Sequence, residues 1–226
     1  SGIQFRNAAG EMEYGWTTSW GLTTRLVGAL VMTHSDDDGL ILPPRIAPSH
    51  LVILPILHKE ETKGKVLEAC DLLAKELKKV HYQGAPLRVV VDKREMRGGE
   101  KGWSWIKKGI PLRLEVGLRE LEAGRFSLLR RNRPHREGLS LTQEELIAQL
   151  PSLLDEMQEL LLTAALAFRE ERTVTIESEQ AFCDYFREEG RGGFVLAHVD
   201  LEPKIEARLK EELAVTPRCI PFDVEQ

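Results

Sequence analysis

The sequence has no apolar run of about 18 residues, which is the length that a membrane-spanning helix needs. It also lacks the charged, apolar and small-residue regions of a secretory signal peptide. Its three cysteines, Cys70, Cys183 and Cys219, are odd in number and far apart, which argues against a disulfide framework and a compact metal knuckle. We therefore expect buried or idle thiols in a cytoplasmic protein without a membrane segment.

Positive charge is not in excess. The chain carries 31 lysines and arginines against 36 acidic residues, which argues against a uniformly basic nucleic-acid-binding protein, and no DNA partner is expected. Basic residues nevertheless gather between Arg88 and Arg136, while the acids concentrate in the flanking helices and the C-terminal part. This distribution predicts a local site for a polyanion.

The length of 226 residues predicts two or three compact units. The chain begins at Ser1 rather than at an initiator Met, and its first motif follows almost at once, so we expect an excised fragment. The sequence pattern divides the chain into four parts, residues 1–48, 49–150, 151–172 and 173–226.

The first part has a pattern that is typical of a nucleotide site. Strand-forming residues run from Thr17 to Trp20, Gly21 follows, and apolar residues recur at helical spacing to about His34, which predicts a strand, a tight turn and a buried helix. Arg25 lies in the first turn of that helix, where its guanidinium could stack on a base or bind phosphate. The alternative is an ordinary core helix in which Arg25 pairs with a nearby acid.

Three successive acids, Asp36, Asp37 and Asp38, follow this helix. Their carboxylates point in different directions, and no further ligand stands at metal-binding spacing, so they predict a solvated turn rather than a metal site. A short apolar strand is expected next, at residues 40–42.

The second part predicts a small α/β domain with a mixed sheet, within a chain that is α+β overall. The expected elements are strands at 51–57, 87–92, 110–117 and 126–131, a helix at 60–80 and a short helix at 103–108. The Gly-rich stretch 97–102 is expected to be a loop. It lacks the Walker spacing, so it is not interpreted as a phosphate-binding loop.

The remaining sequence predicts mainly helices. A capping-box pattern at Thr142 and Glu145 starts one helix, and Pro151 is expected to separate it from a second helix that runs to about Arg172. The last part predicts a helix at 179–188, a turn at 190–193, a strand at 194–198, a helix at 203–213 and a strand at 218–222.

The string TTSWGLTTR, followed by GALVMTHSDDDGLILPPRIAP, resembles the third signature motif of class II aminoacyl-tRNA synthetases in its prolyl-tRNA synthetase form. The resemblance continues through DKREMRGGEKGWSWIKKGIPLRLEVG and GGFVLAH to RCIP, and so covers nearly the whole chain. It implies the C-terminal portion of an archaeal/eukaryotic-type enzyme. The four parts would then be a piece of the catalytic domain, the class IIa anticodon-binding domain, a connecting helix and an incomplete C-terminal domain.

This resemblance also implies a function, a proline–tRNA ligase that activates proline with ATP and transfers it to tRNA(Pro). Arg25 matches the motif's ATP-contacting arginine, and the proline and adenylate pocket would include the turn residues Thr18, Ser19, Trp20 and Gly21. ATP would enter as its Mg²⁺ complex, and the full-length enzyme would be a homodimer. The second motif should lie upstream, so we expect the fragment alone to be inactive.

An anticodon-binding domain must hold single-stranded bases, which proteins stack on aromatic or guanidinium planes and hydrogen-bond at their edges. The candidate residues for this task are Arg94, Lys101, Trp103, Arg113, Glu115, Arg130 and Arg131. In the strand at 110–117, alternation places Arg113 and Glu115 on one polar face, where the carboxylate could accept from a base amino group. The alternative is a structural charge network between these two residues on a solvated sheet face.

Family members with bound zinc carry cysteines shortly after the histidine that matches His198 and again further along. Here Val199, Asp200 and Leu201 stand in the first region, and Cys219 has no partner cysteine. A closed structural zinc site needs four ligands, so no zinc is expected and His198 is predicted to be a core or surface histidine.

Two other functions are consistent with part of the pattern. One is a noncatalytic RNA-binding module that derives from a synthetase. The other is an unrelated α/β nucleotide-binding protein, which would need a phosphate-binding loop after the first strand; none follows Leu57.

Overall fold

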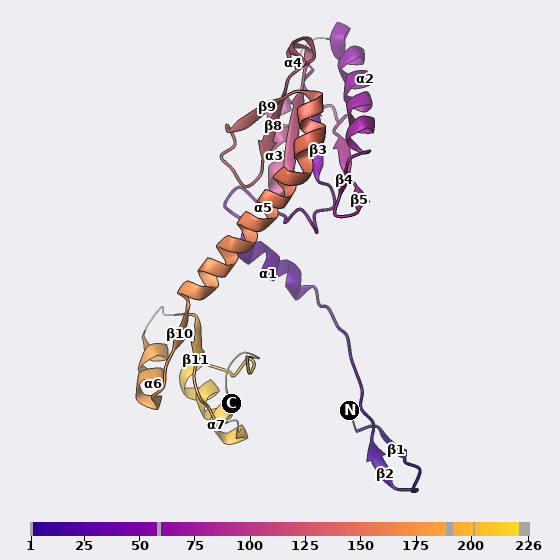
Figure 1. Cartoon of the computed structure of the whole chain (residues 1–226). Coiled ribbons are helices and arrows are strands. Elements are labelled where there is room, and N and C mark those ends of the chain that lie inside the picture. The colour runs from indigo at the N-terminus through magenta and orange to yellow at the C-terminus, as the bar shows by residue number, and fades with distance from the viewer. Residues whose placement is uncertain (1, 58–59, 189–191, 201, 222–226) are drawn as a thin grey trace. The chain divides into compact units, whose positions relative to one another are not determined.

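The computed structural model describes residues 2–57, 60–188, 192–200 and 202–221, and the chain divides into two compact units, residues 1–154 and 155–226 (Figure 1). Within the described ranges, no helix has both the length and the apolar character to cross a membrane.

The first unit opens with an antiparallel hairpin of β1 (Gln4–Arg6) and β2 (Met12–Tyr14), followed by the helix α1 (Arg25–His34). The prediction of this helix is confirmed, but the predicted strand at residues 17–20 is wrong. That segment has no regular structure, because no neighbouring strand pairs with it among the described residues. The expectation that α1 is buried is also wrong, since none of its residues is buried.

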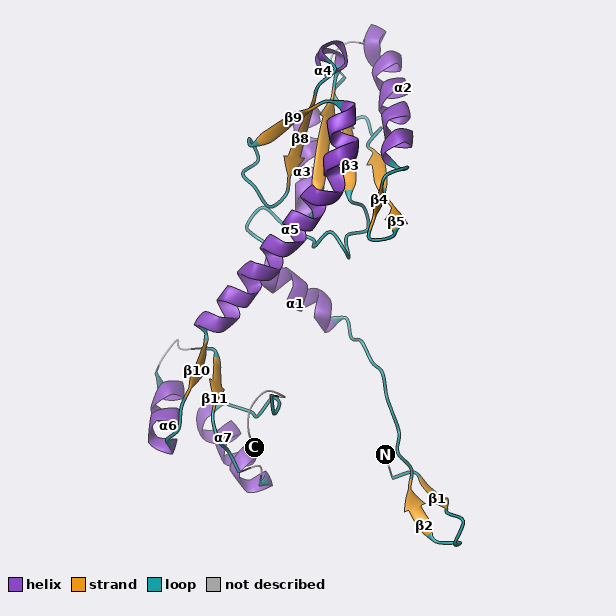
Figure 2. Cartoon of the chain, viewed as in Figure 1, coloured by secondary structure: helices purple, strands orange, loops and turns teal. Residues whose placement is uncertain are grey.

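A mixed sheet forms the centre of the first unit, as the sequence predicted, and it has five strands rather than the four that were expected (Figure 2). Its strands are β3 (Leu51–Pro55), β6 (Val89–Val91), β7 (Leu112–Val116), β8 (Phe126–Arg130) and β9 (Gly138–Leu141), in the order β6-β3-β7-β8-β9. The first three are parallel, and β8 and β9 are antiparallel to their neighbours. A separate small hairpin is formed by β4 (His81–Tyr82) and β5 (Ala85–Pro86).

Helices cover both faces of this sheet. The larger core joins one face to α2 (Glu60–Leu77) and to the first turns of α5 (Gln143–Glu171), where Leu146, Leu150 and Leu154 are buried. On the other face, Val52 and Leu54 of β3 pack with Trp105 of α3 (Gly98–Lys107). The residues of β7 therefore alternate between these two covered faces, and the alternative in which Arg113 and Glu115 lie on a solvated sheet face is not supported.

Several elements differ from the predictions. The Gly-rich stretch is not a loop, because α3 begins at Gly98, and α4 (Leu118–Ala123) and β9 were not expected. Residues 40–42 form no strand. Pro151 lies inside α5 rather than between two helices, because buried leucines on both sides of it share one packed face. The capping box is confirmed, with Thr142 N–H donating to Glu145 Oε2 (2.7 Å) and Glu145 N–H donating to Thr142 Oγ1 (3.2 Å).

The second unit contains the rest of α5 and a pair of short parallel strands, β10 (Thr173–Thr175) and β11 (Phe194–Leu196). Two helices accompany them, α6 (Glu179–Arg187) and α7 (Pro203–Leu213), close to their predicted bounds. The strand β10 was not predicted. Residues 218–221 form no strand, and residue 222, like residues 190 and 191 of the predicted turn, lies outside the described ranges.

Candidate functional site

The five predicted substrate residues before and at the start of α1 form no enclosed site. Thr18, Ser19, Trp20, Gly21 and Arg25 are all exposed, and the Trp20 side chain is 94% exposed. Arg25 begins α1, as the spacing predicted for the first turn. In the described part of the chain it has no ion pair, so the alternative of a core helix with a paired arginine is not supported.

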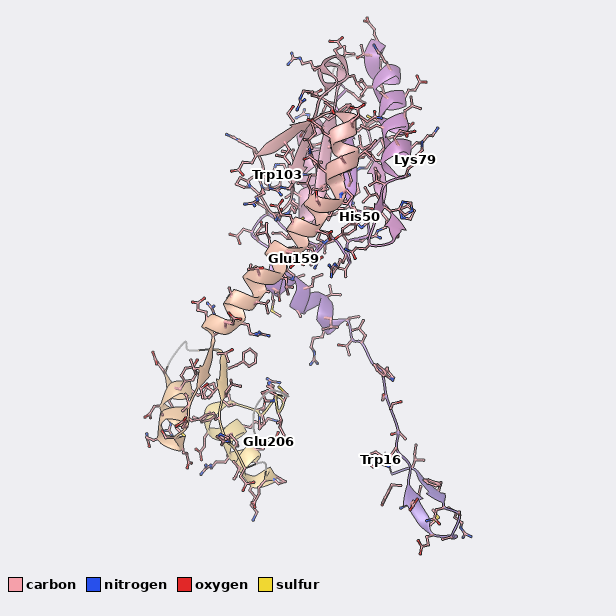
Figure 3. The ribbon with its side chains drawn as sticks, viewed as in Figure 1. Trp16, His50, Lys79, Trp103, Glu159 and Glu206 are labelled. Atoms are coloured by element: carbon pink, nitrogen blue, oxygen red, sulfur yellow. The ribbon has the colours of Figure 1, made fainter. Side chains whose placement is uncertain are left out.

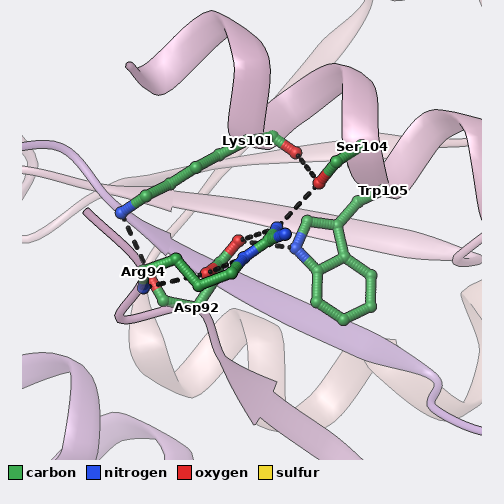
Figure 4. Close-up of polar contacts among 5 residues, drawn as sticks. All are labelled: Asp92, Arg94, Lys101, Ser104 and Trp105. Carbon is green, nitrogen blue, oxygen red and sulfur yellow. Dashed lines mark hydrogen bonds and ion pairs between the residues drawn. The ribbon is translucent and has the colours of Figure 1, made fainter. Parts of the chain in front are cut away.

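Asp92, directly after β6, organises one end of α3 (Figure 4). Arg94 donates from Nε to Asp92 Oδ1 (2.8 Å) and from Nη2 to Oδ2 (2.6 Å), and Trp105 Nε1 donates to Oδ2 (2.8 Å). The hydrogen bonds from Arg94 are the main cause that lowers the pKa of Asp92, so this carboxyl is held ionised despite its burial. Sequence reasoning missed Asp92, although an acid at the carboxyl end of a parallel strand is a recognisable signal.

Two predicted anticodon residues take part in this cluster. Arg94 also donates from Nη2 to Ser104 Oγ (2.7 Å), and Lys101 Nζ donates to the Asp92 carbonyl (3.3 Å). Lys101 is only 3% exposed. Both cations therefore bind this cluster, which fixes the loop between β6 and α3 against the helix.

Arg113 of β7 has an unusual environment. The residue is 3% exposed, and its Nε and Nη2 atoms are buried with no hydrogen-bond partner among the described residues. Burial is the largest cause that lowers the pKa of Arg113, while the charge of Glu115 opposes it. No hydrogen bond or ion pair joins Arg113 to Glu115 in the described part of the chain, so the predicted alternative of a structural charge network has no contact to support it.

Trp103 and Glu115 lie nearer to solvent than Arg113. Trp103, labelled in Figure 3, lies on α3. It is 46% exposed, and its ring meets His135 edge-on with centroids 5.4 Å apart. Glu115 is half-buried. Trp103 thus retains ring surface on which a base can stack, and Glu115 retains carboxylate oxygens that can accept hydrogen bonds.

Arg131 has a structural environment instead. It is 2% exposed, its guanidinium donates to both carboxylate oxygens of Asp36, and it also binds the carbonyls of Gly39 (3.1 Å) and Ile106 (3.2 Å). The side chain is therefore committed to contacts within the protein. Arg130, the last residue of β8, is half-buried.

The acids after α1 are not simply a solvated turn. Asp36 binds Arg131, and Asp38 Oδ2 lies 2.7 Å from His135 Nε2, while Asp37 is exposed. Hydrogen bonding from Arg131 is the main cause that lowers the pKa of Asp36. Sequence reasoning identified the turn but missed its partners, because nothing in the local pattern relates residues 36–38 to residues 131–135.

No group of three or more histidines, cysteines and acids is placed to hold a metal ion in the part of the chain that the structure describes. His198 and Cys219 are both exposed. Cys70 is buried in the main core, and burial raises the pKa of its thiol to about 12, which makes it unreactive.

The sheet and its helices belong to a known class of domain. Residues 50–153 match the family model described as an anticodon binding domain, and these residues include all five strands of the mixed sheet.

Comparison with whole proteins extends the similarity to nearly the entire chain. The chain is 46% identical to proline–tRNA ligase 2 of Anaeromyxobacter dehalogenans, and the aligned region covers 99% of this chain and 46% of the relative. It is also 46% identical to the proline–tRNA ligase of Rhodopirellula baltica, over 97% of the chain and 43% of the relative. The crystal structure of prolyl-tRNA synthetase from Cryptosporidium parvum, complexed with L-proline and AMP, superposes with a TM-score of 0.78 at 31% identity, over 98% of this chain and 46% of that one.

Over nearly its whole length, the chain is thus similar to a C-terminal region of prolyl-tRNA synthetases that includes the anticodon-binding domain. It spans less than half the length of the curated relatives that it matches.

Proposed function

We propose that this chain is part of a proline–tRNA ligase, in which the α/β domain reads the anticodon of tRNA(Pro) and the segment up to α1 completes the site for proline and ATP. The similarity to proline–tRNA ligases supports the reaction. The observation that carries the anticodon role is the environment of Arg113, whose buried Nε and Nη2 atoms have no hydrogen-bond partner within the described ranges.

A buried charge without hydrogen bonds is unfavourable, and proteins rarely retain one without compensation. The Arg113 environment offers a carboxylate nearby but no direct contact. A bound nucleotide would supply the missing acceptors, either from a base edge or from a phosphate oxygen, and hydrogen bonds to a guanidinium are among the strong ones. We infer that Arg113 contacts an anticodon nucleotide directly.

Two further predicted residues have environments that suit direct contact. Trp103 offers an exposed ring face for stacking a base, and Glu115 offers a carboxylate that can accept from a base amino group. Arg94 and Lys101 support the site by fixing the start of α3 through Asp92. Arg130 is proposed to act at the edge of the site, and Arg131 through the position of α3, because its own guanidinium is already bound.

In the complete enzyme, Arg25 would contact ATP, which enters as its Mg²⁺ complex, and the turn of residues 18–21 would help to enclose proline. A cationic side chain at this position stabilises charge that develops on the phosphates during adenylate formation. The exposure of these residues supports the further proposal that the chain alone neither activates proline nor binds ATP tightly. The complete enzyme is proposed to be a homodimer that needs no zinc at His198.

The experiment compares the complete enzyme with the chain. The complete enzyme should catalyse proline-dependent exchange between ATP and pyrophosphate and should charge tRNA(Pro), whereas the chain should bind an anticodon stem-loop of tRNA(Pro) without catalysing exchange. Glu115→Ala should weaken charging and spare exchange. ATP–pyrophosphate exchange that proline does not stimulate would refute the ligase assignment. A complete protein that binds the RNA but catalyses no exchange would favour a noncatalytic RNA-binding module.

A further inference from the structure

The turn after α1 is joined to the α/β domain by two acidic side chains. We call residues 36–39 the aspartate turn. Asp36 binds the guanidinium of Arg131, and Asp38 binds the imidazole of His135 (2.7 Å). Both partners follow β8, far away in the sequence. The aspartate turn is therefore fixed to the domain by specific contacts rather than by chain connectivity alone.

The backbone reinforces this connection at the C-terminal end of α3. Leu40 N–H donates to the Lys107 carbonyl (3.1 Å), and Leu42 N–H donates to the Gly109 carbonyl (3.3 Å). The two segments approach so closely that a Cβ on Gly39 would lie 2.6 Å from Lys107 Cα, and one on Gly109 would lie 2.7 Å from Leu40 Cβ. Only glycine permits this approach at either position, and both have a positive φ.

The same contacts reach the residues that face the anticodon. Arg131 Nε donates to the carbonyl of Ile106 in α3, and the ring of His135 packs edge-on against Trp103 of the same helix. Thus α3 carries Trp103, the proposed stacking residue, and its C-terminal end is bound to the aspartate turn. At its other end, the aspartate turn is one residue away from the last residue of α1, the helix that begins with Arg25.

We propose that the aspartate turn transmits anticodon binding to α1, and that Asp36 and Asp38 are positioning residues for Arg25 in the charging reaction. This inference rests on the function proposed above. A nucleotide that stacks on Trp103 changes the surroundings of His135. A shift of α3 moves Ile106, which binds Arg131, and Lys107, which binds Leu40 directly after the aspartate turn. Because coupling between two sites is a free-energy difference, the loss of these contacts should reduce the dependence of catalysis on the anticodon.

The acids themselves do not bind the RNA in this scheme. Asp36 and Asp38 carry the same sign of charge as the phosphates, and each is paired with a basic group of the protein. Their replacement should therefore leave RNA affinity nearly unchanged. This expectation separates a positioning role from direct recognition.

The test uses the complete enzyme with two transcripts, tRNA(Pro) and the same tRNA with a substituted anticodon, and measures kcat and KM for each. In the unaltered enzyme, the substitution should raise KM and lower kcat. We define the KM ratio and the kcat ratio as the factors by which the anticodon substitution raises KM and lowers kcat. In Asp38→Ala and in the double variant Asp36→Asn/Asp38→Ala, the KM ratio should persist while the kcat ratio should shrink. The kcat ratio should shrink by about fivefold or more in the double variant. Asp38→Glu, which retains a carboxylate, should recover most of the kcat ratio.

Asp37→Ala is the matched control, because Asp37 belongs to the same turn but its side chain makes no hydrogen bond or ion pair with the described residues, unlike Asp36 and Asp38. It should behave like the unaltered enzyme. A kcat ratio that persists in both Asp38→Ala and the double variant would overturn the coupling, and so would an equal loss of the kcat and KM ratios, which would indicate damage to the RNA site. If the unaltered enzyme charges both transcripts equally, the anticodon role itself fails, and that outcome is visible before any variant is measured.

Discussion

Replacement of Arg113 by methionine should separate function from stability. Methionine is a flexible apolar side chain without charge, so Arg113→Met removes buried Nε and Nη2 atoms that have no partner in the part of the chain that the structure describes. A buried unsatisfied polar group costs about 1 to 3 kcal/mol, so the free energy of unfolding should stay the same or rise by up to about that amount. Substitutions of buried residues usually destabilise, and the expected sign is therefore unusual.

The same variant should bind RNA more weakly. A hydrogen bond to a charged group contributes about 1.5 to 3 kcal/mol, which corresponds to a loss of roughly tenfold to 100-fold in affinity for an anticodon stem-loop. Urea unfolding followed by tryptophan fluorescence measures the stability, and fluorescence anisotropy of a labelled stem-loop measures the affinity. Lys79→Met is the control, because Lys79 lies in the exposed turn directly after α2 and its side chain makes a surface ion pair with Glu76, and it should change neither quantity appreciably. An Arg113→Met variant that unfolds more easily and still binds RNA normally would refute the reasoning, because Arg113 would then be a structural residue.

Three further predictions follow from individual environments. His50 is 1% exposed and its pKa is lowered to about 4, mainly by burial, so the stabilisation from its neutral form is complete above pH 6.5 and is lost as the pH falls from 6.5 toward 4. In this range His50 takes up a proton in the unfolded chain but not in the folded protein, which should lower the free energy of unfolding by up to about 3 kcal/mol. The variant His50→Asn keeps an acceptor for the Arg88 N–H, and the free energy of unfolding should then depend less on pH in this range. Gly109→Ala should lower the free energy of unfolding by more than about 1 kcal/mol, because φ is +71° and the added Cβ would lie 2.7 Å from Leu40, and an unchanged urea midpoint would contradict this. In the complete enzyme, Arg25→Ala should slow ATP–pyrophosphate exchange by about tenfold or more and leave tRNA affinity intact, and unchanged exchange would exclude the ATP contact.

The strands and helices with strong apolar patterns were predictable. The buried strand that became β3 and the amphipathic helix α2 follow from local periodicity, and so does the alternation in β7. Alternation could not show that both faces of β7 are covered, because the polar residues Arg113 and Glu115 resemble a solvated face. The covering helix α3 begins in a glycine-rich stretch, and its stability comes from tertiary packing that helix propensity does not report.

The candidate site was only partly predictable for a related reason. The residues proposed to contact the anticodon could be selected by their chemistry, and the motif residues by resemblance. Their roles depend on partners distant in sequence, as in the pairs Asp36–Arg131 and Asp38–His135. Both Arg113 and Arg131 were candidates by residue type. Among the described residues, Nε and Nη2 of Arg113 have no partner, whereas the guanidinium of Arg131 binds four acceptor atoms.

The central claim is that the α/β domain of this chain distinguishes the anticodon of tRNA(Pro) through Arg113. The most direct measurement is the affinity of the chain for two stem-loops that differ only in the anticodon bases, before and after Arg113→Met. Our account predicts a preference of about tenfold or more for the proline anticodon and its loss in the variant. Equal affinity for the two stem-loops, or a preference that survives Arg113→Met, would contradict it.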